Sequence, residues 1–415
     1  DINEGRITKE AAQELLECLY IKMTNILWLN EEVVANSASG YMPYQTLMLG
    51  GVDRLGRNAV NDLSYLCIDA MANVRTSQPT IAATLHRRET PEDFWMKLTD
   101  LCSLGMGHPT FINFETLRTQ CLALGYPIRE AMDCTIQGCS ETHGPGGTKF
   151  GHTNGVMFNP SMAIEFVFSR GVKRTPDQLG SGKRIGLDTG DPRKFMTFNK
   201  FKNAVKKQIA EGIRQGVIAT SWVELLLRFF PLPLQSLLTK DCLERGKDVT
   251  NGGARVYAGM GVSTVGGWAN LADSLAAVKK LVYEDKKIVM EDLYRAIETN
   301  FEGYEEIRQM LIYDAPKYGN DVDYVDDLAR EMWDFINDEI RKYRSPNGNL
   351  QVPSTSASSA NNIFGWATWA LPDGRKAGEA LSDTIAPSPG RDTKGPTATI
   401  KSITKLCHDK QFGSI

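Results

Sequence analysis

The sequence predicts an α/β fold with a largely parallel sheet, because short apolar runs alternate with longer segments of helical periodicity along most of the chain. The chain has 415 residues, of which 42% are hydrophobic. That length exceeds the roughly 250–300 residues at which a single core usually stops growing. Either two domains or one large α/β barrel would therefore fit.

The first third of the chain shows the alternation clearly. Apolar runs predict strands at residues 44–49, 79–85 and 110–113. Apolar residues at helical spacing predict helices around them, at residues 9–30, 60–74, 91–104, 114–125 and 127–132. The third of these helices, at residues 91–104, is expected to have Thr90 as its N-cap and Pro91 at its first position.

The rest of the chain is predicted to be mainly helical, around two glycine-rich stretches. Helices are expected at residues 160–168, 198–216, 220–238, 270–283, 291–300 and 322–344, with a strand at 350–357 and a turn at 372–375. The glycine-rich stretches, residues 138–155 and 251–267, are poor candidates for helices because glycine costs about 1 kcal/mol in a helix interior. Long irregular segments in compact domains are usually functional or disordered, which directs attention to the first stretch.

Composition excludes several classes of function. The net charge is −3, with 47 basic and 50 acidic residues, so we expect no nucleic-acid partner. The eight cysteines contain no CxxC pair, and the five histidines form no HExxH or HxxxH motif, so we expect no metal site and mostly buried, reduced cysteines. No apolar run approaches the roughly 20 residues of a membrane span, and no signal peptide is evident. A cytoplasmic protein is the prediction.

The first glycine-rich stretch begins with the best candidate for a catalytic motif, Gly138-Cys139-Ser140-Glu141-Thr142. The preceding apolar residues resemble the end of a strand, so a thiol and a carboxylate two residues apart would point to the same side of an extended chain. A thiol can carry a hydrogen atom, and a nearby carboxylate can take or give a proton. The alternative is a buried cysteine beside a surface glutamate, without a catalytic role.

The motif and several ordered segments resemble the glycyl radical enzymes, the pyruvate formate-lyase-like superfamily, along essentially the full length of the chain. Cys139 and Glu141 match the Gly-Cys-x-Glu motif of the branch that contains dehydratases, C–N and C–S lyases and arylacetate decarboxylases. Pyruvate formate-lyase itself differs, because it has two adjacent cysteines where this chain has Cys139-Ser140. The other matching segments are residues 50–53, 61–66, 77–79, 273–282, 316–321 and 371–378.

The resemblance implies a ten-stranded α/β barrel of two antiparallel half-barrels, with residues 1–415 forming one barrel domain that is incomplete at both ends. It also implies a thiyl radical on Cys139 that abstracts a substrate hydrogen, with Glu141 as acid/base. No cofactor is expected to be bound in this chain. The radical would be stored on a protein glycine, installed with S-adenosylmethionine by a separate radical activating enzyme. A small organic substrate and a homodimer are the other expected partners.

The radical-bearing glycine of the family lies in an Arg-Val-x-Gly-aromatic loop near the C-terminus, and we expect the chain to stop before that loop. Arg255-Val256-Tyr257-Ala258-Gly259 has the wrong spacing. Ser263 aligns where 4-hydroxyphenylacetate decarboxylase has a second glutamate, and Ser263 and His152 are the expected substrate-binding residues.

The reaction itself stays open at this point. Decarboxylation of an aryl- or alkylacetate and elimination of water, amine or sulfite are equally compatible with the motif. Acyl transfer of the formate C-acetyltransferase type, and a catalytically incomplete fragment that only folds or binds, are further alternatives.

Overall fold

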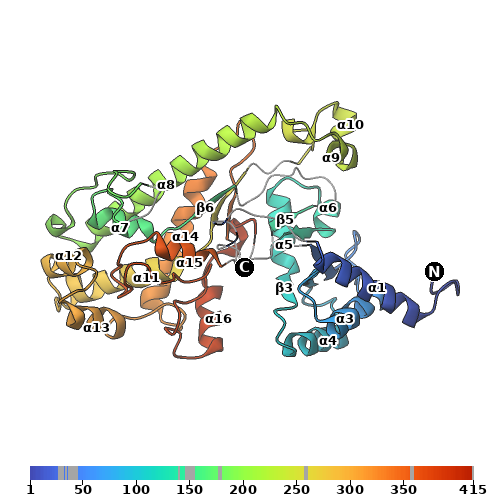
Figure 1. Ribbon diagram of the computed structural model, residues 1–415, viewed down its shortest axis with the longest axis horizontal. Coiled ribbons are helices and arrows are strands. Elements are labelled where there is room, and N and C mark those ends of the chain that lie inside the picture. Colours follow the sequence, from blue (N-terminus) through green and yellow to red (C-terminus); the bar gives the residue numbers. More distant parts are fainter. Residues whose placement is uncertain are drawn as a thin grey trace.

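The computed structural model describes residues 1–26, 32, 35, 45–138, 141–144, 155–175, 180–256, 260–355 and 359–413. These residues form two lobes, each built on a three-stranded parallel sheet, with a short hairpin between them (Figure 1). Helices cover both sheets, as expected for parallel strands that are buried on their faces. The predicted α/β class is therefore confirmed.

The sheet of the N-terminal lobe has the order β1-β2-β3 and consists of Thr46–Gly50, Thr80–Leu85 and Thr110–Asn113. Its central strand is buried on both faces: Ile81 packs in one apolar cluster and Ala82 in another. The helices of this lobe are α1 (Lys9–Thr24), α3 (Asp62–Val74), α4 (Glu92–Ser103), α5 (Phe114–Ala123) and α6 (Ile128–Met132).

Helix α4 starts differently from the prediction. Its N-cap is Pro91, which makes no side-chain capping bond, so the assignment of Thr90 as N-cap was wrong. The Thr90 hydroxyl instead accepts a hydrogen bond from the His86 amide at 2.9 Å. That bond closes the turn between β2 and α4, so the hydroxyl is used there and does not cap the first turn of the helix.

The sheet of the C-terminal lobe has the order β6-β7-β8 and consists of Val156–Phe158, Val262–Thr264 and Pro353–Thr355. Strand β6 directly follows the first glycine-rich stretch and β7 lies inside the second, at positions where no strand was predicted. Around this sheet lie helices α7 (Met162–Phe168), α8 (Phe198–Leu227), α11 (Trp268–Ala277), η3 (Val278–Glu284), α12 (Met290–Glu298), α13 (Glu305–Tyr313), α14 (Asp323–Arg341), α15 (Ala360–Trp366) and α16 (Pro396–Thr404). Shorter helices are η1 (Pro192–Lys194), α9 (Pro233–Leu238), α10 (Cys242–Arg245), η2 (Val249–Asn251) and η4 (His408–Lys410).

Helix α8 is one long helix where two shorter ones were predicted. The predicted break at Gly216 is a contact point: a Cβ added there would lie 3.1 Å from the Val156 Cγ1 atom on β6. A Cβ on Gly212, one turn earlier, would lie 2.8 Å from the Phe158 ring. The two glycines therefore allow the helix to approach β6 closely, and they do not end it.

The core of the C-terminal lobe is a single large apolar cluster. Trp268 on α11 and Trp333 on α14, each 1% exposed, meet edge to face at its centre, with ring centroids 5.2 Å apart. Burial of two indole rings contributes several kcal/mol through the hydrophobic effect. This core holds β7 and the segment after it in place.

Arg375, in the turn predicted at residues 372–375, is a structural anchor of this lobe. Its guanidinium group is buried and donates to the carbonyl oxygens of Gly365 at 2.6 Å, Trp369 at 3.0 Å and Glu379 at 2.9 Å. We expect Arg375→Lys to lower the free energy of unfolding by about 3 kcal/mol, because an ammonium group cannot reach all these carbonyls. Thermal unfolding measures the change. Arg330→Lys on the exposed face of α14 should stay within about 0.5 kcal/mol, and equal effects of the two variants would contradict this account.

Asp273 and Lys317 are buried, interact electrostatically, and belong to two of the segments that resemble the family, residues 273–282 and 316–321. Asp273 accepts from the Tyr318 amide at 2.7 Å, and Lys317 donates to the Leu311 carbonyl at 2.6 Å. Burial raises the pKa of Asp273 to about 7, against the opposing attraction of Lys317, and burial also lowers the pKa of Lys317.

The raised pKa of Asp273 predicts a pH-dependent stability. An aspartate in the unfolded chain has a pKa of about 3.9. Between that pH and about 7, Asp273 therefore keeps its proton in the folded protein but loses it in the unfolded chain. The resulting stabilisation is complete below pH about 3.9 and is lost as the pH rises toward about 7. We expect the free energy of unfolding, measured with urea, to fall across this window by up to roughly 1.4 kcal/mol per pH unit. The same slope in Asp273→Asn would refute the assignment.

The seven cysteines among the described residues are all unpaired, and four of them are buried, at positions 67, 121, 134 and 242. Across the same residues, no helix combines the length and the apolar character needed to cross a membrane.

Candidate functional site

The candidate motif lies on a two-stranded antiparallel hairpin between the two lobes (Figure 1). Its strands are β4 (Thr135–Gln137) and β5 (Glu141–His143), in which Gln137 is paired with Glu141 and Ile136 with Thr142. The sequence correctly placed a strand before Gly138 but treated the residues after it as irregular. The prediction of an irregular segment was wrong for Glu141–His143, which form β5 and pair with β4. Most glycines of the stretch come after these three residues.

Glycine is required at position 138 for two reasons. Its φ is +61°, in the left-handed region that side chains disfavour. A Cβ at this position would also lie 3.0 Å from the Oε2 atom of Glu141. The Glu141 carboxylate therefore folds back over the residue that directly precedes Cys139.

The two faces of the hairpin have different surroundings. Ile136 and Thr142 face the N-terminal lobe, where the Thr142 hydroxyl is hydrogen-bonded to the side chain of Gln120 on α5. Glu141 is adjacent to Thr142 in the strand, so its side chain points to the opposite face. The Glu141 side chain is only 3% exposed. The hairpin thus presents a buried carboxylate on the face that does not pack against α5.

A cavity of about 240 Å³ lies on the Thr142 face, where α5, the hairpin and the end of the chain meet. Asn113, Gln120, Thr142, His408 and Gly413 contribute to its lining. Because this cavity is on the other face of β5 from Glu141, it is not a substrate chamber for the Glu141 carboxylate in this arrangement.

The end of the chain joins the hairpin to the second sheet. Thr142 donates its amide to the Phe412 carbonyl at 3.4 Å, and Phe412 donates its amide to the Pro353 carbonyl at 2.9 Å. Glu141 also forms an antiparallel bridge with Gly413. The Glu141 backbone is therefore separated from β8 only by the extended segment around Phe412.

Ser263 lies at the centre of the second sheet. It is the middle residue of β7, paired with Met157 on one side and with Ser354 on the other. Val262 points into the apolar core, so Ser263 faces away from the covering helices. Ser263 and Ser354 are 0% and 1% exposed. Ser354 was not predicted as a site residue, although its position in the middle of a predicted strand was the available signal.

Two of the four predicted site residues, Cys139 and His152, lie outside the described residues. Their closeness to Glu141 and Ser263 therefore stays a prediction. Within the described part of the chain, no three histidine, cysteine, aspartate or glutamate side chains are grouped so as to hold a metal ion.

Two parallel sheets from separate segments of the chain, with a short hairpin between them, agree with an α/β barrel assembled from two half-barrels. The family model described as pyruvate formate lyase-like matches residues 1–365. A trans-4-hydroxy-L-proline dehydratase from Clostridioides difficile is 32% identical over 100% of this chain and 52% of the relative. An isethionate sulfite-lyase from Oleidesulfovibrio alaskensis is 34% identical over 97% of this chain and 48% of the relative.

A solved structure agrees with these matches. The glycerol-bound B12-independent glycerol dehydratase from Clostridium butyricum superposes with a TM-score of 0.92 and 34% identity, over 97% of this chain and 50% of that chain. The chain belongs to the pyruvate formate lyase-like family of glycyl radical enzymes. The predicted barrel class is confirmed by this agreement, and the chain spans about half the length of the relatives it matches.

Proposed function

We propose that this chain supplies the hydrogen-abstracting cysteine and the acid/base of a glycyl radical lyase that acts on a small organic molecule. The observation that carries the proposal is the buried Glu141 carboxylate, folded over Gly138 beside the position of Cys139. A glutamate that only solubilised a surface loop would not be buried on a hairpin between two sheets. Family membership supports the same assignment.

The proposed roles follow from the chemistry of the two groups. The thiyl radical on Cys139 takes a hydrogen atom from a substrate carbon, so that an S–H bond forms and a C–H bond breaks. Glu141 takes the proton of the hydroxyl group on that carbon while the leaving group departs with the electron pair of its bond, and in a dehydration the protonated Glu141 gives the departing hydroxide the proton that makes it water. The thiol then returns a hydrogen atom to the product radical. A dry site between the two sheets would protect these radicals from solvent.

Elimination is the reaction that we favour, over decarboxylation of an aryl- or alkylacetate. Ser263 and Ser354 place two buried hydroxyl groups on the sheet face that points away from the helices. Hydroxyl groups on this face suit a substrate that carries a hydroxyl or another polar leaving group, because a hydroxyl can both donate and accept a hydrogen bond. We also propose His152 as a substrate-binding residue, in addition to Ser263.

The remaining features of the proposal concern the assembly around this chain. We expect residues 1–415 to belong to one barrel domain, the radical glycine to lie outside them, and a radical S-adenosylmethionine activating enzyme to install the radical. A homodimer and a cytoplasmic location complete the expectation.

A product assay tests the proposal and separates the two reactions. The complete polypeptide that contains these residues would be activated anaerobically and offered trans-4-hydroxy-L-proline, isethionate, glycerol and an arylacetate. We expect loss of water or release of sulfite from at least one of the first three. Release of carbon dioxide from the arylacetate alone would assign decarboxylation instead, and no turnover of any elimination substrate would contradict the favoured reaction.

A further inference from the structure

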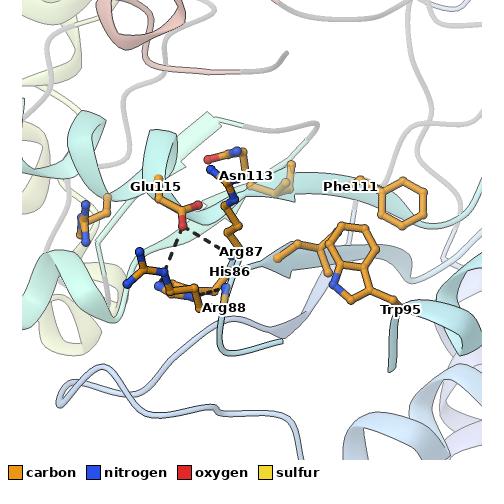
Figure 2. Close-up of a pocket in the computed structure, with 10 residues that line it drawn as sticks. His86, Arg87, Arg88, Trp95, Phe111, Asn113 and Glu115 are labelled. Carbon is orange, nitrogen blue, oxygen red and sulfur yellow. Dashed lines mark hydrogen bonds and ion pairs between the residues drawn. The ribbon is translucent and has the colours of Figure 1, made fainter. Parts of the chain in front are cut away.

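A second pocket lies at the carboxyl ends of β2 and β3 in the N-terminal lobe, with a volume of about 790 Å³ (Figure 2). The carboxyl edge of a parallel sheet is the usual place for ligands in α/β proteins. This volume is within the range of roughly 300–1,000 Å³ that small-molecule sites occupy. The pocket is built by the turn after β2, by α4 and by the start of α5.

The pocket is lined by more positive than negative charge. Arg87, Arg88 and Arg118 supply three guanidinium groups, and Glu115 supplies the single carboxylate. Across the described residues, none of these three guanidinium groups forms an ion pair, whereas most arginines elsewhere in the two lobes do. An anion in the pocket would provide an oppositely charged partner for these three groups.

Two aromatic rings form the other end of the pocket. Trp95 and Phe111 are nearly parallel, with ring centroids 6.3 Å apart and an angle of 16° between the planes. They are 40% and 41% exposed, so this flat apolar wall is open to a ligand. Figure 2 shows the ring pair at one end and Arg88 with Glu115 toward the other.

Hydrogen bonds fix the turn that carries Arg87 and Arg88, whereas Arg118 lies on α5. His86 Nδ1 accepts hydrogen bonds from the amides of Arg88 at 3.2 Å and Glu89 at 3.0 Å. The Arg87 amide donates to Glu115 at 3.4 Å. The same Glu115 oxygen lies 3.9 Å from His86 Nε2, so the carboxylate faces this turn, and within the described residues it forms no ion pair with the three guanidinium groups. A rigid turn lowers the entropy cost of binding.

We propose that this pocket binds an organic anion with a planar aromatic ring. The carboxylate or phosphate group faces Arg87, Arg88 and Arg118, and the ring lies against Trp95 and Phe111. The site is separate in the sequence from the Cys139/Glu141 motif, and it needs no radical chemistry.

Isothermal titration of the chain with AMP and with 2-naphthoate tests the site, and the two probes distinguish a phosphate from a carboxylate ligand. We expect saturable binding of at least one probe, weakened about tenfold in the double variant Arg87→Ala/Arg88→Ala. Trp95→Ala should weaken binding about fivefold. Adenosine should bind more weakly than AMP.

Matched controls come from the C-terminal lobe, where Arg330→Ala and Trp366→Ala remove an exposed cation and an exposed ring. Circular dichroism confirms that each variant is folded. No saturable binding of either probe overturns the proposal. Binding that is equal in the pocket variants and in the controls also overturns it.

Discussion

Replacing Cys139 with alanine should abolish product formation in the activated enzyme while leaving the glycyl radical signal intact. The glycine would store the radical, whereas the thiol would transfer it, so removing the thiol should interrupt the reaction after activation. A product assay combined with electron paramagnetic resonance measures both quantities on the same sample.

Cys134→Ala is the matched control for this experiment. Cys134 precedes the same hairpin and is 8% exposed, but it lies in the apolar cluster of the N-terminal lobe. We expect a modest loss of stability and retained turnover in this variant. Substantial turnover in Cys139→Ala would end the proposed role of Cys139, whatever the family relationship.

Replacing Glu141 with glutamine should lower turnover by roughly 10²–10⁴, the range typical of lost acid/base catalysis. The amide keeps the size of the carboxylate and can occupy the same space over Gly138, so the fold should be preserved. The amide cannot take a proton near neutral pH. Steady-state kinetics with the preferred substrate measures the effect, and an unchanged melting temperature shows that the loss is chemical.

Glu165→Gln provides a control with a carboxylate of similar burial. Glu165 is 1% exposed and accepts from the amides of Trp369 at 2.9 Å and Arg174 at 3.1 Å. Burial raises its pKa, but its partners are backbone groups, so its role is to hold loops together. We expect turnover close to the wild-type value. A similar loss in both glutamine variants would mean that Glu141 is also only structural.

The N-terminal lobe could be predicted from the sequence because its signals are local. Strand β2 is an apolar run that ends at a turn, β3 leads directly into α5 through the N-cap Asn113, and α3 has Asn61 as its N-cap in a complete capping box. Errors there are small shifts of boundary, such as the start of α4. Local hydrogen-bonding chemistry decides these elements, and a sequence displays that chemistry directly.

The C-terminal lobe was harder to predict because tertiary contacts decide its elements. Strand β7 has only three residues and stands in a glycine-rich stretch, yet it is paired on both sides. Gly216 suggested a helix end, but the close approach of α8 to β6 uses that glycine. Neither pairing nor close approach leaves a periodic pattern in the sequence.

The roles of the site residues stay predictions. The C-x-E spacing directed attention to Glu141, which the structure places buried on the hairpin. The link from the hairpin through Phe412 to β8 could not be foreseen, because these residues are about 270 positions apart in the chain. Ser354 was missed for the same reason: its pairing with Ser263 joins segments that are distant in sequence.

The most direct test of the central claim is electron paramagnetic resonance of the complete polypeptide under anaerobic conditions, with product measured in the same tube. We predict an organic radical signal that appears only when the activating enzyme and S-adenosylmethionine are present, and product that forms only in samples with that signal. Equal product formation in samples without the radical signal would contradict the account.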